Sequence, residues 1–321
     1  MKKKLLLVLT ACLATTAFFA CNKSPEVGGV LTPVKIAYQP IVFGVPLFVA
    51  EQEGLFKKHG VVADSKSFTS ANDMINALVA GEVVIVPGAP LVPVLSLESK
   101  YPGKFRVFAH SVMTSDKPFD RIIVKEDSSL KSAADLAGKR LALIPGTTAL
   151  NTIKAFLKKN NVSPDAVNFV QLAPPAQLSA LASGAVEALY AYEPTLTVAL
   201  SKGGFRAISP SIYCSMLEPC PLVVSIIDRD FERKHPKEAA AAIGAINDAV
   251  TLMKKDPAKA SESLVPYTKI DAGIAHKVSL QNMTVTGEMN VPNLQQFINI
   301  LVDIGELQSA ISADKLLAPT Q

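Results

Sequence analysis

The chain carries the same order of expected elements twice, and this repeat limits its fold more than any other feature. Residues 34–90 and residues 139–194 each read as strand, helix, strand, helix, strand. The helix stops also correspond, since KHGV matches KNNV and ALVAG matches ALASG. Because parallel strands need a helical crossover between them, the repeat predicts two α/β lobes, each with a mostly parallel sheet.

In parallel sheets, ligands collect beyond the carboxyl ends of the strands. The turns that follow the strands are therefore the expected ligand site. Each turn precedes or adjoins an expected helix start, and together they cover residues 39–45, 68–71, 87–90, 110–113, 146–148 and 190–194. If the lobes face each other, helix N-termini from both sides point into one cleft.

The stretch LIPGTTALNTIKAFLKK, residues 143–159, changes from a buried-strand pattern to helical spacing. Thr147 or Thr148 is placed to cap the first helical turn, whose free N–H groups suit an anion. The turn has one glycine and no lysine that reaches a phosphate, so it matches neither the Walker A pattern nor the dinucleotide fingerprint. It therefore favours holding a ligand over binding a nucleotide for catalysis.

The segments between and after the repeats predict how the lobes connect. Residues 105–113 read as a strand, SDKPFD as a break, residues 121–128 as a strand entering the second lobe and residues 220–231 as a returning strand. Four helices are expected after residue 236. The predicted organisation is a hinged pair of lobes, with lobe 1 at 34–117 and 226–321 and lobe 2 at 118–225.

The first 33 residues predict export. Three lysines precede an apolar stretch that ends in FFAC, which gives a secretory signal over residues 1–20, too short for a membrane span. The end at Ala20 and Cys21 resembles the lipobox of bacterial lipoproteins, which implies that Cys21 is lipidated and that residues 21–33 form a tether. The expected location is periplasmic or cell-surface, with a lipid anchor in the membrane; ordinary signal cleavage near Ala20 is the alternative.

Charge and histidine placement exclude two classes of function. Lys2, Lys3 and Lys4 leave with the signal, so the formal charge falls from +4 to +1, which argues against a nucleic-acid surface. Four scattered histidines without clustered carboxylates predict no metal cage. No cofactor is expected.

The folded part keeps two cysteines, Cys214 and Cys220. In an exported protein such a pair predicts a small disulfide loop, with a reactive site as the alternative.

Four segments of the chain resemble a known protein family. Over most of residues 34–235 the chain resembles the nitrate, sulfonate, taurine and pyrimidine-precursor group of periplasmic substrate-binding proteins of ABC transporters. The matching segments are IAYQPIVFGVPLFVAEQEGLFKKHGV, INALVAGEVVI, SSLKSAADLAGKRLALIPGTTALNTIKAFL and LASGAVEALYAYEP. The resemblance implies a type II periplasmic-binding fold, capture of a small molecule between the lobes, and delivery to a permease and ATPase complex. Val84 replaces the usual Asp, and Tyr192 replaces a frequent Trp.

The ligand contacts implied by the resemblance lie in the turns after the strands. Candidate ligand-binding residues are Gln39, Phe43, Gly44, Thr69, Ser70, Gly88, Ala89, Pro90, His110, Gly146, Thr147, Thr148, Tyr192 and Glu193. Each has a plainer alternative: the threonines cap a helix, Phe43 and Gly44 pack a loop, and Glu193 orders the hinge. The aliphatic and tyrosine-rich turns favour an anionic or zwitterionic organic molecule, such as a sulfonate, an aromatic acid or a pyrimidine-like compound.

Two rival functions stay open. An exported enzyme on the same fold would need a nucleophile, a base and an orienting acid, and no G-x-S-x-G stretch occurs. The pyrimidine-precursor synthesis enzyme that resembles this group depends on a cysteine cluster, which Cys214 and Cys220 do not supply. A lipoprotein that senses a ligand is the other alternative. We expect a monomer that is not an enzyme.

Overall fold

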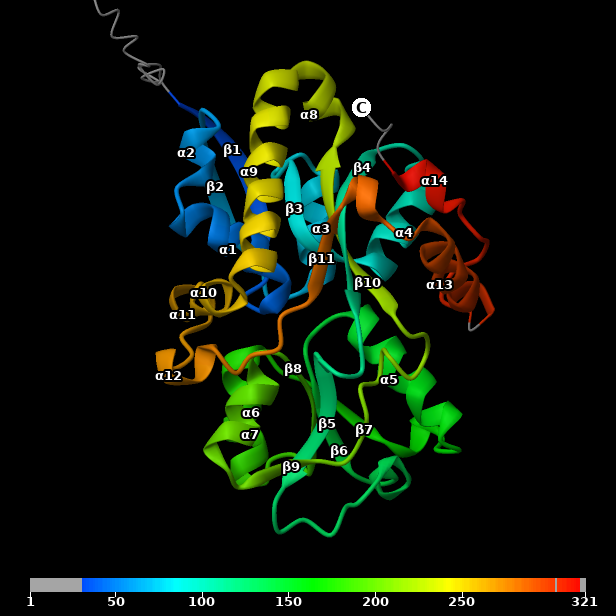
Figure 1. Ribbon diagram of the computed structural model, residues 1–321. Helices are drawn as coiled ribbons and strands as arrows, with labels where there is room; N and C mark the ends of the chain where they lie inside the picture. The colour runs from blue at the N-terminus through cyan, green and yellow to red at the C-terminus, as the bar shows by residue number, and fades with distance from the viewer. Residues whose placement is uncertain (1–30, 304, 318–321) are drawn as a thin grey trace, which may run out of the picture. The chain divides into compact units, whose positions relative to one another are not determined.

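The structure is a computed structural model that describes residues 31–303 and 305–317. Its strands form two sheets, one in each lobe (Figure 1). The predicted signal peptide, the lipidation site Cys21 and most of the tether lie outside the described residues. No helix in the described ranges is long and apolar enough to cross a membrane.

The first sheet has six strands and defines lobe 1. In spatial order they are β11 (Asn282–Val285), β4 (Phe105–Met113), β10 (Cys220–Asp228), β3 (Ile85–Pro90), β1 (Thr32–Tyr38) and β2 (Val61–Ser67). The second sheet has five strands and defines lobe 2. They are β7 (Asn168–Gln171), β6 (Arg140–Leu143), β8 (Ala188–Tyr192), β5 (Asp120–Lys125) and β9 (Phe205–Ala207).

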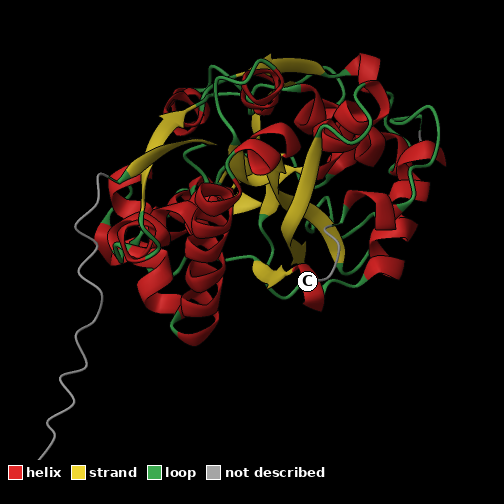
Figure 2. Ribbon diagram, turned by 90° about the horizontal axis from the view of Figure 1, so that it is seen from above, coloured by secondary structure: helices red, strands yellow, loops and turns green. Residues whose placement is uncertain are grey.

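Helices lie on both sides of the strands (Figure 2). The repeats contain α1 (Val45–Gln52), α2 (Leu55–Lys58), α3 (Ala71–Val79), α5 (Thr147–Lys159) and α6 (Pro174–Ser183). The other helices are α4 (Leu91–Lys100), α7 (Thr195–Lys202), α8 (Arg229–Lys234), α9 (Pro236–Lys255), α10 (Pro257–Glu262), α11 (Leu264–Thr268), α12 (Ala272–Ala275), α13 (Val291–Asp303) and α14 (Ala313–Leu316). Short 3₁₀ turns are η1 (Val42–Gly44), η2 (Ala133–Leu136), η3 (Pro164–Ala166) and η4 (Thr286–Glu288).

The predicted repeat is confirmed. In lobe 1, β1 pairs in parallel with β2 and β3, and in lobe 2, β6 pairs in parallel with β7 and β8. All six residues of β3 and all five of β8 are buried, as continuous apolar strands covered on both faces should be. The remaining strand pairs are antiparallel, so each sheet is mixed rather than mostly parallel.

The returning strand corrects the predicted lobe boundary. Cys220 already pairs with Met113, and β10 continues this ladder to Asp228 opposite Phe105. A boundary between residues 225 and 226 would cut β10 in two, because all nine residues of the strand are in the first sheet. Residues 220–225 therefore belong to lobe 1. The helices α4 and α7 begin directly after the turns at residues 87–90 and 190–194, where helix starts were expected, whereas the edge strand β11 was not predicted.

Candidate functional site

A cavity of about 20 Å³ lies where the two lobes meet, beyond the ends of the strands. Lobe 1 lines it with Gln39, Ile41, Phe43, Ala71 and Pro90, and lobe 2 with Ile144, Pro145, Gly146, Thr148, Ala149, Tyr192 and Tyr213. This volume is about enough for a single water molecule. An organic ligand therefore needs the lobes to separate before it enters.

Aromatic rings close one side of this cavity. The aromatic wall consists of Phe43, Tyr192 and Tyr213, which line the cavity, and of Phe119, which packs against them without lining it. Phe119 stacks on Phe43 with ring centroids 4.6 Å apart and lies at the same distance from Tyr192. The hydroxyls of Tyr192 and Tyr213 are 3.0 Å apart and share a hydrogen bond. Phe43 comes from lobe 1 and the two tyrosines from lobe 2, so the wall spans both lobes.

The start of α5 forms the polar side of the cavity. Gly146 precedes the helix with φ 130° and ψ 155°, a backbone conformation that essentially only glycine adopts. Its N–H donates to Oε1 of Gln171 at 3.2 Å. Thr148 follows in the first turn; it is 7% exposed, and its buried Oγ1 has no hydrogen-bond partner. The helix start thus presents an unused hydroxyl beside its own first N–H groups.

A close backbone approach fixes the position of Phe43. Gly88, near the end of β3, has φ 90°, and a Cβ at this position would lie 1.9 Å from the carbonyl oxygen of Phe43. Only glycine permits this approach. The backbone at the end of β3 therefore contacts the backbone of η1, and this contact positions the Phe43 ring in the aromatic wall.

A buried carboxylate supports the wall from behind. Asp120 accepts hydrogen bonds from Oγ of Ser211 at 2.6 Å, from the hydroxyl of Tyr190 at 2.7 Å and from the N–H of Ile212 at 3.2 Å. Complete burial nevertheless raises the pKa of Asp120 to about 6. These bonds fasten the irregular segment that carries Tyr213.

Glu193 orders the junction between the lobes and does not line the cavity. Its carboxylate accepts from Oγ1 of Thr197 at 2.7 Å and from the N–H of Thr197 at 3.1 Å, in the first turn of α7. Burial raises its pKa to about 7, although its bonds to Thr197 and to the backbone of Ser279 act in the opposite direction. The geometry therefore supports the alternative in which Glu193 orders the hinge and does not contact the ligand.

His110 lies within β4 and faces the neighbouring edge strand. Its Nδ1 is 2.5 Å from Oγ1 of Thr284 in β11, and burial lowers its pKa to about 4. The imidazole is therefore neutral near pH 7 and is not part of the cavity.

The structure brings together six of the fourteen predicted ligand residues. The cavity is lined by Gln39, Phe43, Pro90, Gly146, Thr148 and Tyr192. Residues that do not line it are Gly44, Thr69, Ser70, Gly88, Ala89, His110, Thr147 and Glu193. Among these, Ser70 caps α3 by accepting from the N–H of Asp73, and Thr69 accepts a long bond from Gln39 Nε2 through its carbonyl.

Two aromatic site residues were missed from the sequence. Phe119 lies in the SDKPFD break, and Tyr213 lies in a segment with no helical or strand periodicity. The only available signal for Phe119 was its position next to the predicted lobe crossing. Nothing in the local pattern around Tyr213 indicated that it returns to the cavity.

The predicted disulfide is wrong in this structure. Cys214 and Cys220 are both free and buried. Cys220 is held at the start of β10 opposite Met113, while Cys214 is fixed in a turn where its N–H donates to Ser211 Oγ. Burial raises the pKa of Cys214 to about 11, so it is a neutral thiol rather than a reactive thiolate.

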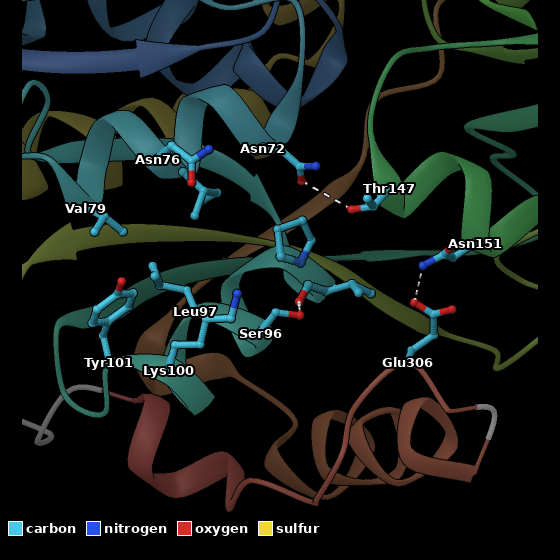
Figure 3. Close-up of a pocket in the computed structure, with 13 residues that line it drawn as sticks. Asn72, Asn76, Val79, Ser96, Leu97, Lys100, Tyr101, Thr147, Asn151 and Glu306 are labelled. Atoms are coloured by element: carbon cyan, nitrogen blue, oxygen red, sulfur yellow. Dashed lines mark hydrogen bonds between the residues drawn. The ribbon is translucent and has the colours of Figure 1, made fainter.

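A larger groove of about 490 Å³ lies outside the cavity, between α3, α4 and α5 (Figure 3). Two hydrogen bonds cross it from lobe 2 to lobe 1. Thr147 Oγ1 donates to Oδ1 of Asn72 at 3.3 Å, and Asn151 Nδ2 donates to Oε2 of Glu306 at 2.7 Å. These bonds join the lobes beside the cavity. Within the described residues, no group of three or more His, Cys, Asp or Glu side chains is arranged to hold a metal ion.

Two α/β lobes with a cavity between their strand ends define the class: a type II periplasmic-binding-protein fold. The chain belongs to the NMT1/THI5-like family, whose model matches residues 44–260.

Two relatives in sequence are named as binding proteins. The taurine-binding periplasmic protein of Escherichia coli strain K12 is 28% identical over 219 residues, which cover 67% of this chain and 65% of that protein. A putative ABC transporter periplasmic binding protein of Brachyspira hyodysenteriae is 26% identical over 98% of this chain and 94% of that protein.

Solved structures share the fold. The alkanesulfonate-binding protein SsuA of Xanthomonas axonopodis pv. citri, bound to MOPS, superposes with a TM-score of 0.70 at 18% identity, covering 89% of this chain and 98% of that one. The desulfurization enzyme DSZB superposes with a TM-score of 0.65 at 15% identity, covering 90% and 96%. The fold therefore occurs in both binding proteins and an enzyme.

Proposed function

We propose that the chain is the substrate-binding component of an ABC importer. It captures a small organic molecule between its two lobes and delivers it to a membrane permease and ATPase complex. The observation that carries this proposal is the cavity at the lobe junction, which both lobes line at their strand ends. The names of the relatives support the same role.

The proposed ligand is anionic or zwitterionic. A helix N-terminus favours negative charge, and α5 directs its first turn at the cavity with a free hydroxyl beside it. A micromolar dissociation constant needs about 8 kcal/mol of binding free energy, and each hydrogen bond to a charged group supplies about 1.5 to 3 kcal/mol. A few donors together with apolar walls are sufficient without any catalytic group.

We further propose that the protein acts outside the cytoplasm as a lipid-anchored monomer. The support is the signal-like segment before residue 21, the lipobox-like ending at Cys21 and the polar tether that follows. Mass spectrometry of the N-terminal peptide from cell membranes tests the anchor: a diacylglyceryl adduct on Cys21 supports it, and an unmodified N-terminus after Ala20 contradicts it.

An enzymatic role is the second candidate, because DSZB shares the fold. Hydrolysis or desulfurization needs a nucleophile or an acid-base group at the reacting atoms. Among the residues that line the cavity, the groups of this kind are the hydroxyls of Thr148, Tyr192 and Tyr213, and burial raises the pKa of both tyrosines, which disfavours proton transfer. Capture without chemistry therefore agrees better with the lining. A ligand-sensing role would use the same cavity with a different partner.

A thermal-shift screen of sulfonates, aromatic acids, amino-acid derivatives and pyrimidines tests the binding role. A ligand at 100 times its dissociation constant adds about 2.7 kcal/mol to the unfolding free energy and so raises the melting temperature. The variant Ala149→Leu places extra side-chain volume in the cavity and should lose the response while staying folded. If no compound raises the melting temperature of the unmodified protein, the binding role is contradicted.

A further inference from the structure

We propose that the ligand has an aromatic body and a single monoanionic oxyanion head. The head binds at the start of α5 with Thr148, and the body packs on the aromatic wall. This inference rests on the proposed function and narrows its ligand class. The proposed aromatic ligand differs from those in the names of two relatives, which specify taurine and aliphatic sulfonates.

The head position follows from Thr148. Its hydroxyl is buried and unpartnered although it lines the cavity, which is unusual because buried polar atoms nearly always have a partner. A ligand acceptor at this point would complete its hydrogen bonding. Thr148 lies in the first turn of α5, a helix of thirteen residues, so the N-terminal N–H groups and dipole of α5 act on the same acceptor. Next to it, a Cβ on Gly146 would meet no atom within 4 Å, so the approach is open.

The charge of the head follows from the lining. No Lys, Arg or His side chain lines the cavity. Two buried carboxyl groups, those of Asp120 and Glu193, lie in lobe 2 near the aromatic wall. A dianionic head would lose its hydration without gaining an ion pair, which is costly in a buried site. A delocalised monoanion needs only the donors that are present.

The body follows from the geometry of the rings. Phe43 and Phe119 lie at an interplanar angle of 29° with centroids 4.6 Å apart, and Phe119 lies against Tyr192. Phe43 belongs to lobe 1, so separating the lobes exposes the ring faces that it covers. A flat ring inserted there gains stacking that a saturated ring does not, equivalent to about a 2-fold to 10-fold difference in affinity.

Matched ligands test the body. Calorimetric titration compares benzoate with cyclohexanecarboxylate and benzenesulfonate with cyclohexanesulfonate. We expect each aromatic member to bind several-fold tighter, and Phe43→Leu to reduce this preference toward equality. If the saturated or aliphatic members bind as tightly or tighter, the aromatic body is refuted while the importer role stands. If none of the four binds and the wider screen also fails, both proposals fall.

One variant tests the head. Thr148→Val keeps the shape of the side chain and removes the hydroxyl, and we expect benzoate affinity to fall about 10-fold to 100-fold. Thr251→Val, on the exposed face of α9, is the matched control and should leave affinity unchanged. Phenyl phosphate tests the charge and should bind more weakly than benzenesulfonate. Unchanged affinity in a folded Thr148→Val protein, or tighter binding of phenyl phosphate, overturns the proposed head site.

Discussion

The two repeats build the same elements but place different chemistry at the cavity. In the first repeat, the turn before α1 is apolar, all three residues of η1 are buried, and Phe43 fills the space at the lobe junction. In the second repeat, the turn before α5 holds Gly146 and the unpartnered hydroxyl of Thr148. The turn of the first repeat therefore supplies a hydrophobic surface, and the turn of the second supplies hydrogen-bond donors.

The ends of the last strands differ in the same way. Gly88 and Ala89 precede Pro90 in the first repeat, and Tyr192 and Glu193 precede Pro194 in the second. The small pair lets the β3 backbone touch η1, whereas the large pair adds a ring to the aromatic wall and a carboxylate that caps α7. A repeated topology thus fixes where the turns lie, and only the side chains decide which turn binds, packs or forms the junction.

Gly88→Ala should break the first repeat's turn most severely. The new Cβ would overlap the Phe43 carbonyl oxygen and also force alanine into a positive φ. We expect the free energy of unfolding to fall by about 4 kcal/mol in urea titrations. Gly138→Ala also has a positive φ but meets no atom within 4 Å, so it should cost only about 1 kcal/mol. Equal losses in the two variants would show that the close approach is not a structural requirement.

Glu193, at the end of the second repeat, should make the free energy of unfolding depend on pH. Its pKa is raised from 4.5 to about 7 by burial, so the folded protein keeps the proton after the unfolded chain has released it. Stability should therefore fall by about 3 kcal/mol as the pH rises from about 4.5 to 7, and then level off. Asp120, whose pKa is also raised by burial, adds a fall of the same sign below about pH 6, so unfolding titrations at several pH values compare the unmodified protein with Glu193→Gln. The difference between their unfolding free energies should change by about 3 kcal/mol from about pH 4.5 to 7, and a constant difference would contradict the role of Glu193.

Gly146→Ala tests whether the second repeat's turn depends on conformation alone. Because a Cβ meets no atom there, the cost is backbone strain of about 2 kcal/mol, less than at Gly88. We expect ligand affinity to fall as well, since the helix start moves. Thermal melts and titrations on the same sample measure both effects. A loss of stability as large as that of Gly88→Ala would contradict the difference between the two turns.

Asn151→Ala should have the smallest effect. It removes the hydrogen bond to Glu306 that joins α5 to lobe 1. We expect a loss of about 1 kcal/mol or less, because the bond is only partly buried. Chemical unfolding measures the change in unfolding free energy. A loss above about 3 kcal/mol would contradict the minor contribution expected of this hydrogen bond. Lys202→Ala, at the far end of α7, serves as the surface control.

The sequence predicted the topology well because strand and helix periodicity are local properties. The parallel units around β1 and β6 and the helix start at Thr147 follow from apolar spacing and stop residues. The antiparallel additions depend on which distant strand returns to a sheet edge, and local spacing does not encode this. The boundary near Cys220 was misplaced for that reason.

The site was only partly predictable. Tyr192 is the last residue of β8, and Thr148 lies in the first helical turn after β6, so the rule about strand ends found them. The rule failed for His110, which lies inside β4 and not at its end. Its side chain contacts Thr284, because β11 pairs with β4 beside it. Tyr213 reaches the cavity through the hydrogen bonds of Asp120 to its neighbours, a long-range arrangement without a sequence pattern.

Solution scattering with and without a bound ligand tests the central claim most directly. The cavity in the structure is too small for an organic molecule, so the ligand-free protein must open to admit one. We predict that the radius of gyration falls when a compound identified by thermal shift is added at saturation. An identical scattering curve in both states, with binding verified by titration, would contradict capture between the two lobes.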